Sequence, residues 1–289
     1  MAFASAASAL SAQTLSSLLV PSGPESLALA GSTLARPAGV FAATDNASAI
    51  SLSDKSFALG ASYNLWAPQN VGSSVADASA FFRISERFAF GLGGRFYSSK
   101  EMAATNLNGA TIDTFTPKDI IGNLALSYRV LDGLSIGVTG KYVSSSIAPD
   151  LSGTAFGADV SVSCAHGPFS ASAALCNLGS AVSYGSSSYS LPMLAKAGAA
   201  FSLKGLTVSA EADYLFDGAF AASLGAEFGL AKIAFLRAGY HYGSSEKGLP
   251  TFASAGIGLK FAGVELNAAY LFASETLGGT MTFGLGYSF

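Results

Sequence analysis

The sequence is poor in charged residues. Only 15 Lys and Arg and 18 Asp and Glu occur among 289 residues, which is 11% of the chain. Soluble domains carry about 25% charged residues, and their surfaces are correspondingly polar. Because 50% of the residues are apolar and the mean hydropathy is +0.44, much of the surface is expected to face something other than water.

Three further features are scarce or missing. No stretch approaches the ~20 apolar residues of a membrane helix, because Ser, Gly, Thr, Lys or Asp interrupts every run, and this argues against a helical membrane bundle. The net charge of -3 and the lack of any Lys/Arg cluster argue against a nucleic-acid partner. Two cysteines are too few for a disulfide scaffold or a multi-cysteine zinc site.

What the chain does contain is strict alternation of apolar and polar residues. In the clearest segment one face carries only apolar residues: Leu206, Val208, Ala210, Ala212, Tyr214 and Phe216. The opposite face carries Thr207, Ser209, Glu211 and Asp213. A period of two indicates a β-strand with two different environments. Since only helices and closed barrels can span a bilayer, the pattern favours a membrane β-barrel.

Fourteen such segments can be drawn. They predict an all-β fold, a 14-stranded antiparallel transmembrane β-barrel with a short N-terminal helical or plug segment. The expected strands are 56–66, 77–85, 87–98, 119–130, 133–146, 152–164, 168–177, 191–203, 206–216, 219–229, 232–243, 251–261, 263–273 and 279–289.

Connection lengths alternate along this series. Each even-numbered strand is followed by a tight turn, whereas the longer loops 66–77, 99–118, 178–190 and 244–250 follow odd-numbered ones. Outer-membrane barrels keep short turns on the periplasmic side and long loops outside. Outward-facing aromatic residues near both strand ends predict the two girdles typical of such barrels. The expected location is therefore the bacterial outer membrane, with outer-membrane lipids around the barrel and both termini periplasmic.

The two ends of the chain carry separate signals. Residues 1–12 are interpreted as a signal-peptide remnant because they are rich in Ala and Ser and end in small residues; a flexible tail is the alternative. Residues 13–55 are expected to form a periplasmic or plug segment, with one helix from Pro24 to before Pro37, and residues 56–289 the barrel. The last residues match the polar-x-Gly-x-x-aromatic-x-aromatic pattern of a barrel-assembly signal through Thr282, Gly284, Tyr287 and Phe289.

The same alternation places nearly half of the charges inside the barrel. The predicted lumen polar network comprises Arg95, Arg129, Lys141, Asp159, Lys196, Glu211, Asp213, Glu227, Arg237 and His241. One interpretation is a polar translocation path. The other, which we favour, is a network that satisfies itself and fills a narrow barrel.

Catalytic and metal-binding patterns are not found in the sequence. Its two histidines, His166 in a predicted turn and His241 in the lumen, cannot form a pair with metal-ligand spacing. Cys164 and Cys176 fall on adjacent strands with opposite facing, so both are expected to stay reduced. We therefore expect a non-enzymatic protein without cofactor or metal.

Several short segments, in order, resemble the PorV/PorQ family of Bacteroidota outer-membrane proteins, which is similar in fold to FadL-type barrels. The matching segments are Asp45-Asn46-Ala47, Asn177-Leu178-Gly179, Leu191-Pro192 with Lys196-Ala197-Gly198, Leu236 to Tyr240, and Tyr287-Ser288-Phe289. The resemblance covers roughly residues 25–289, but the Asn-Pro-Ala-Gly segment expected before the first strand is missing.

This resemblance implies a non-enzymatic role in type IX secretion and cell-surface attachment, as a shuttle or anchor with protein partners. The partner-binding candidates lie in two loops at the predicted extracellular rim: Lys100, Glu101, Asp113, Lys118, Tyr184 and Tyr189. Two alternatives stay open. One is a FadL-like transporter of hydrophobic small molecules, and the other is an accessory subunit of another outer-membrane assembly machine.

Overall fold

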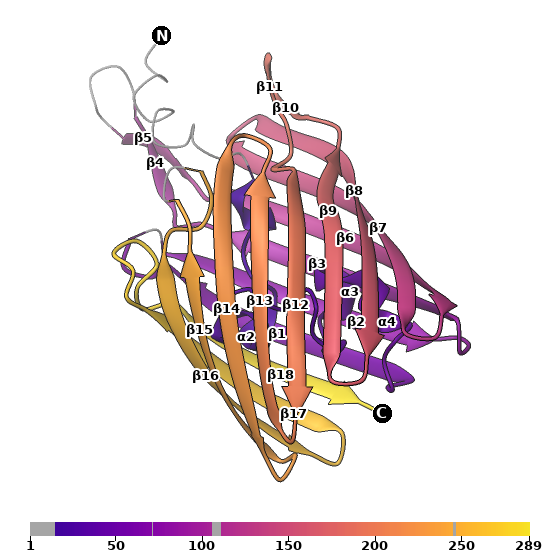
Figure 1. Cartoon of the computed structure of the whole chain (residues 1–289). Helices are drawn as coiled ribbons and strands as arrows, with labels where there is room; N and C mark the ends of the chain where they lie inside the picture. The colour runs from indigo at the N-terminus through magenta and orange to yellow at the C-terminus, as the bar shows by residue number, and fades with distance from the viewer. Residues whose placement is uncertain (1–14, 71, 106–110, 245–246) are drawn as a thin grey trace.

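Fourteen strands close into a single antiparallel barrel (Figure 1). The computed structural model describes residues 15–70, 72–105, 111–244 and 247–289. The barrel closes where β1 pairs with β18, with Ala58 opposite Ser288 and Leu65 opposite Met281. The barrel strands are β1 (Phe57–Trp66), β2 (Ser73–Arg83), β3 (Phe88–Ser98), β6 (Lys118–Leu131), β7 (Leu134–Ala148), β8 (Leu151–His166), β9 (Phe169–Gly179), β12 (Leu194–Leu203), β13 (Leu206–Leu215), β14 (Ala219–Leu230), β15 (Ala234–Tyr242), β16 (Phe252–Phe261), β17 (Val264–Phe272) and β18 (Met281–Ser288).

The predicted all-β barrel with fourteen strands is confirmed, and the differences lie in the connections. The second strand begins at Ser73 rather than at residue 77. Two of the predicted loops contain small hairpins that lie outside the barrel sheet. They are β4 (Met102–Thr105) with β5 (Thr111–Phe115), and β10 (Val182–Tyr184) with β11 (Ser187–Tyr189).

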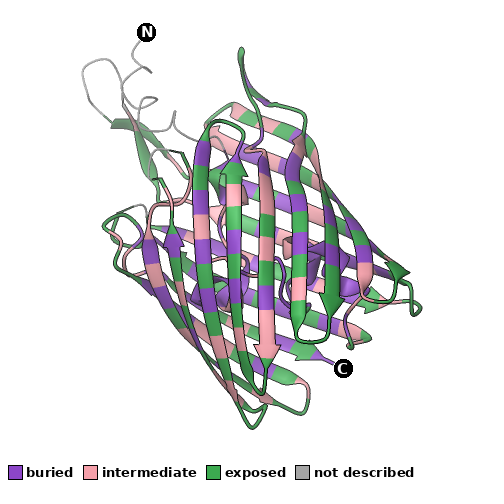
Figure 2. Cartoon of the chain, in the orientation of Figure 1, coloured by how far each residue is buried: buried purple, intermediate pink, exposed green. Residues whose placement is uncertain are grey.

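Alternate residues along the barrel strands are buried and exposed (Figure 2). The exposed set is apolar and aromatic, with Phe261 at 78% and Leu224 at 61% exposure. The buried set contains polar and small residues such as Asn64, Thr282 and Ser127. Apolar residues outside and polar residues inside reverse the order found in soluble proteins, and this arrangement suits a barrel surrounded by lipid.

Residues 15–56 pass through the inside of the barrel and form a plug (Figure 1). This plug contains four short helices: η1 (Ser16–Leu18), α2 (Gly23–Ala28), α3 (Ala42–Asp45) and α4 (Ala47–Ile50). The single helix expected up to Pro37 is therefore wrong. The helix α2 ends at Ala28 because Ala30 and Gly31 adopt left-handed backbone angles (φ 54° and 86°), and the Gly31 N–H donates to the Ser26 carbonyl. Among the described residues, every helix is too short or too polar to cross a membrane.

The plug runs from one mouth of the barrel to the other. We call the end of the barrel with the longer connections the loop end and the opposite end the turn end. Ser17 donates a hydrogen bond to Asp119 at the loop end of β6. Further along, the Ser51 carbonyl accepts a hydrogen bond from Arg129 near the turn end of the same strand. The described chain thus begins at the loop end, whereas Phe289 pairs with Phe57 at the turn end. Residues 1–12, interpreted above as a signal-peptide remnant, lie outside the described residues.

Glycines on the lumen wall allow the plug to pack closely. A methyl group added at Gly60 would overlap Val40, and one at Gly256 would overlap Ala28. The same addition at Gly239 would overlap the backbone of residues 29 and 30. These glycines explain how a chain segment with its own helices fits inside a barrel of this width.

Candidate binding site in the barrel lumen

Charged side chains of adjacent strands pair across the lumen wall. Lys141 of β7 lies 2.8 Å from Asp159 of β8, and Lys196 of β12 lies 2.5 Å from Glu211 of β13. Arg237 of β15 lies 2.5 Å from the Glu227 carboxylate of β14, its direct partner in the strand register. All of these residues were in the predicted lumen network. Only the last pair is directly opposite in the strand register. Lys141 lies opposite Gly157 and Lys196 opposite Asp213, so the other two pairs form diagonally between neighbouring strands.

The plug adds two charges to the Glu227–Arg237 pair. Arg36 donates to the Glu227 carboxylate at 2.7 Å, and Glu25 lies 3.7 Å from Arg36. The sequence analysis did not include Glu25 or Arg36. A signal existed, because the only charged residues among positions 13–50 are Glu25, Arg36 and Asp45, and charges of a segment inside a barrel need partners on its wall.

Arg95 of β3 joins the barrel wall to the start of the plug. It pairs with Asp77 of β2 at 2.6 Å and donates to the carbonyls of Ser17 at 2.7 Å and Val20 at 2.8 Å. Arg95 was predicted to face the lumen, whereas Asp77 was missed. His241 also faces the lumen, where its Nδ1 atom lies 2.8 Å from the Ser223 hydroxyl.

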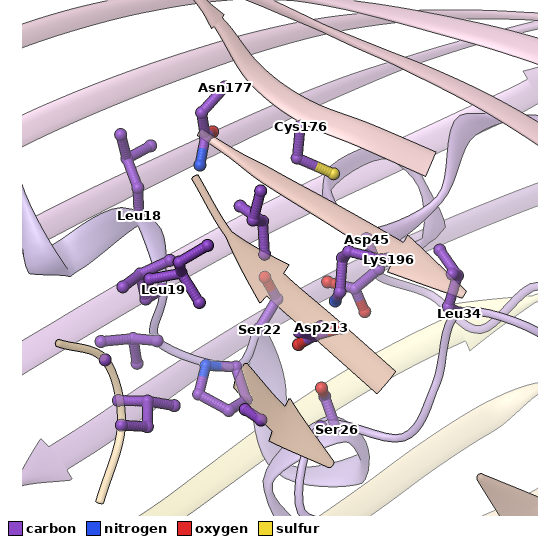
Figure 3. A pocket seen from close by; sticks show the side chains of 18 of the residues that line it. Leu18, Leu19, Ser22, Ser26, Leu34, Asp45, Cys176, Asn177, Lys196 and Asp213 are labelled. Atoms are coloured by element: carbon purple, nitrogen blue, oxygen red, sulfur yellow. The ribbon is translucent and has the colours of Figure 1, made fainter. Parts of the chain in front are cut away.

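A cavity of about 140 Å³ lies between the plug and the loop end of the barrel. Its apolar lining comes from both the plug and the wall and includes Leu18, Leu19, Val20, Leu194, Leu215 and Leu249. Its polar lining includes Asp45 of the plug with Lys196, Asp213 and His241 of the wall. Asp45, Lys196 and Asp213 gather at one side of this cavity (Figure 3).

Charged side chains of both signs line this cavity: Asp45, Asp159 and Asp213 with Arg95, Lys141, Lys196 and Lys247. Lys196 lies directly opposite Asp213 in the strand register and is already paired with Glu211. Burial raises the pKa of Asp45 to about 7, although the Ser22 hydroxyl and the nearby Lys196 oppose this rise. Glu211 does not itself line the cavity and also accepts a hydrogen bond from the Leu34 N–H of the plug at 2.9 Å.

The predicted partner-binding residues lie at the loop end but differ in accessibility. Tyr184 in β10 is only 5% exposed, because it packs against Leu191 and Val182 over the barrel mouth, whereas Tyr189 in β11 is 43% exposed. Asp113 lies in β5 and Lys118 begins β6. Lys100 and Glu101 are exposed residues just before β4.

The predicted assembly-signal residues belong to the closing strand and its end. Thr282 is fully buried, and Gly284 lies beneath Pro24 of the plug. Tyr287 and Phe289 face outward at 42% and 66% exposure. Both cysteines are free, with Cys164 exposed and Cys176 buried. Among the residues that the structure describes, no group of His, Cys, Asp and Glu could hold a metal ion.

Comparison with known proteins finds likeness in structure but not in sequence. No protein-family model and no curated protein matches the chain. The toluene transporter TbuX of Ralstonia pickettii is similar with a TM-score of 0.70 and 14% identity, over 93% of this chain and 98% of that one. The toluene transporter TodX of Pseudomonas putida is similar with a TM-score of 0.71 and 12% identity, over 91% and 96%.

A FadL homologue of Pseudomonas aeruginosa is also similar, with a TM-score of 0.63 and 14% identity over 93% of this chain and 96% of that one. These likenesses correct the interpretation as a PorV/PorQ protein shuttle or anchor. These three structures are named as two toluene transporters and a FadL homologue, and they give no support to type IX secretion, protein partners or an origin in Bacteroidota. The short segments behind that interpretation have structural roles instead, since Asn46 caps α4 and Asn177 adopts a left-handed conformation (φ 59°) at a bulge. The chain has the fold of FadL-type outer-membrane barrels.

Proposed function

We propose that this chain is a non-enzymatic outer-membrane channel that conveys small, largely hydrocarbon molecules through a plugged barrel. The observation that carries the proposal is the cavity of about 140 Å³ between the plug and the loop end. A cavity of roughly 150 Å³ holds one benzene-sized molecule. Structures with the same fold are named as toluene transporters and as a monoaromatic hydrocarbon channel.

The charged lumen is compatible with such cargo because most of its charges neutralise one another. The pairs Lys141–Asp159, Arg237–Glu227 and Arg95–Asp77 each have their partner within 2.8 Å. Such pairs hold the wall together and present few free charges to a passing molecule. Of the two interpretations of the lumen network, this favours structural support over a polar translocation path.

The experiment compares uptake of labelled toluene by cells that express the chain with uptake by cells that carry an empty vector. Ala221 lines the cavity and is 8% exposed, so Ala221→Phe fills the space and should abolish the added uptake. The matched control is Ala222→Phe, one residue further along β14, where the side chain points away from the lumen. Uptake no greater than that of the vector control, or uptake unaffected by Ala221→Phe, would overturn the proposal.

A further inference from the structure

Three neighbouring turns form one side of the turn end of the barrel. They join β8 to β9, β12 to β13 and β14 to β15, and these strands lie side by side in the sheet (Figure 1). Each turn is also bonded to the next strand along the rim. The Ser202 N–H donates to the Pro168 carbonyl at 2.8 Å, and the Gly229 N–H donates to the Gly205 carbonyl at 2.7 Å. The spacing between the turns is therefore fixed by the fold.

The charges on these turns are uncompensated. Lys204 lies in the second turn and Lys232 in the third, and both side chains are exposed. Among the described residues, neither ammonium group has a hydrogen-bond or ion-pair partner. The nearest acidic residues along the chain, Glu211 and Glu227, face the lumen and belong to the ion pairs described above. No Asp or Glu occurs in the turns themselves or beside them, at residues 165–168, 203–206 and 229–234.

Both lysines occupy backbone positions that disfavour this residue type. The angle φ is 48° at Lys204 and 59° at Lys232, which places both in the left-handed region. Gly, Asn and Asp adopt this conformation more readily than other residues. In the turns β6–β7 and β8–β9 a glycine adopts it, at Gly133 and Gly167. A lysine in such a costly conformation, at an exposed turn, points to a function of its side chain.

The outer surface beside the two lysines is apolar. Leu203 and Leu206 flank the second turn, Leu230 and Ile233 belong to the third, and Phe228 precedes it on β14; all five are more than 40% exposed. On a barrel surrounded by lipid, such side chains contact acyl chains. The long apolar stem of a lysine can lie along them while its ammonium group reaches the headgroup level. A fitting ligand has an apolar part along the wall and a negative group at the turns.

We propose that Lys204 and Lys232 bind the phosphate group of an anionic phospholipid whose acyl chains lie along β12 to β15. This inference goes beyond the proposed channel function and does not depend on it. A phosphate oxygen accepts charge-assisted hydrogen bonds from ammonium groups. Each lysine at a membrane surface strengthens the attraction of anionic lipid about fivefold. A zwitterionic lipid binds less well, because its own ammonium group neutralises its phosphate.

The test counts lipids bound to the purified full chain in detergent by native mass spectrometry. The probes are phosphatidylglycerol and phosphatidylethanolamine with identical acyl chains, together with inorganic phosphate. We expect phosphatidylglycerol to bind at least about fivefold more tightly than phosphatidylethanolamine, and inorganic phosphate not to bind at the same concentration. Equal binding of the two lipids would overturn the inference. Inorganic phosphate that binds as tightly as phosphatidylglycerol would also overturn it, because the site would then recognise an anion without its acyl chains.

Two variants place the binding at the turns. Lys204→Asn and Lys232→Asn remove the charges, and both should fold because Asn tolerates the left-handed conformation. Each should weaken phosphatidylglycerol binding about fivefold, and the double variant about 25-fold, with little effect on phosphatidylethanolamine. The matched control is Lys118→Asn, which removes one exposed lysine at the loop end of β6. Unchanged binding in the double variant, or an equal loss in the control, would contradict the inference.

Ionic strength gives a second readout. The distance over which exposed charges interact falls from about 30 Å at 0.01 M salt to about 10 Å at 0.1 M. The preference for phosphatidylglycerol should therefore shrink when the ammonium acetate concentration rises through this range, whereas the double variant should show little salt dependence. A preference that stays constant with salt would show that the two lysines do not recognise the lipid by its charge, and it would overturn the assignment.

Discussion

Arg237 illustrates how a single lumen-facing residue joins the barrel wall to the plug. Its guanidinium pairs with Glu227 and also donates to Asn267 at 2.7 Å, while Arg36 of the plug reaches the same glutamate. The side chain of Arg237 is only 5% exposed. Buried pairs of this kind contribute little when they are formed but cost much when one partner is removed.

We predict that Arg237→Leu destabilises the folded barrel by about 3 kcal/mol, because it leaves the Glu227 carboxylate buried with less compensation. Urea unfolding of the purified protein in detergent measures this change. Arg87→Leu is the control, since Arg87 is exposed in the turn before β3 and should change stability by less than about 0.5 kcal/mol. Equal effects of the two substitutions would contradict the role of the buried pair.

Asp45 predicts a pH dependence of stability. Burial raises its pKa from 3.8 to about 7, so the folded protein favours the protonated carboxyl. The resulting stabilisation is complete below the unfolded pKa and is lost as the pH rises through about 7. We expect the thermal midpoint of the wild type to fall from about pH 5 to about pH 8 and that of Asp45→Asn to fall less. Parallel curves for the two proteins would refute this assignment.

At the scale of elements, the plug and the wall fit through small residues and hydroxyl groups. The helix α4 packs against β6, β7 and β8, where the Ser48 carbonyl accepts from Ser135 and the Ser48 hydroxyl meets Ser163. Each of these hydrogen bonds contributes about 1 kcal/mol. Together with the glycine contacts they hold the plug in one position.

We predict that Gly239→Ala loosens the plug, because the added methyl group would overlap the backbone of residues 29 and 30. Single-channel recording in a planar bilayer should show higher ionic conductance than the wild type. The control is Gly122→Ala, where an added methyl group meets no atom within 4 Å. If Gly239→Ala conducts no more than the control, the plug tolerates this substitution and the close-packing argument is wrong.

At the scale of the whole molecule, the barrel has two different ends. The turn end holds short connections such as the one at Asp132, while the loop end carries the strand pairs β4–β5 and β10–β11. In outer-membrane barrels the longer connections lie outside the cell. The same direction is expected here.

This orientation can be tested with one introduced cysteine at a time in a background that carries Cys164→Ser, since the remaining native Cys176 is buried. We predict that Ser186→Cys, in the exposed turn between β10 and β11, reacts with a membrane-impermeant maleimide on intact cells. Asp132→Cys, exposed in the turn between β6 and β7, should react only after the outer membrane is permeabilised. The reverse pattern of labelling would show that the barrel is inserted in the opposite direction.

Local alternation was sufficient to predict the barrel and the facing of its side chains. A strand with a period of two exposes every second residue to the same surroundings, so Lys196, Glu211 and Arg237 could be placed in the lumen from the sequence pattern alone. The number of strands followed from the same pattern. The function of the protein could not be predicted from short segments such as Asn177-Leu178-Gly179, because in this fold such segments form turns and bulges.

Only the tertiary structure decided how the barrel is filled. The sequence left open whether residues 13–55 lie in the periplasm or form a plug. Their path through the lumen depends on contacts such as Arg36 with Glu227 and Ser17 with Asp119, formed across 191 and 102 residues of sequence. The cavity likewise arises where the plug leaves Asp45 beside Asp213 and Lys196. Alternation along a strand is a local property of the chain, whereas the space between two distant segments exists only once both have folded.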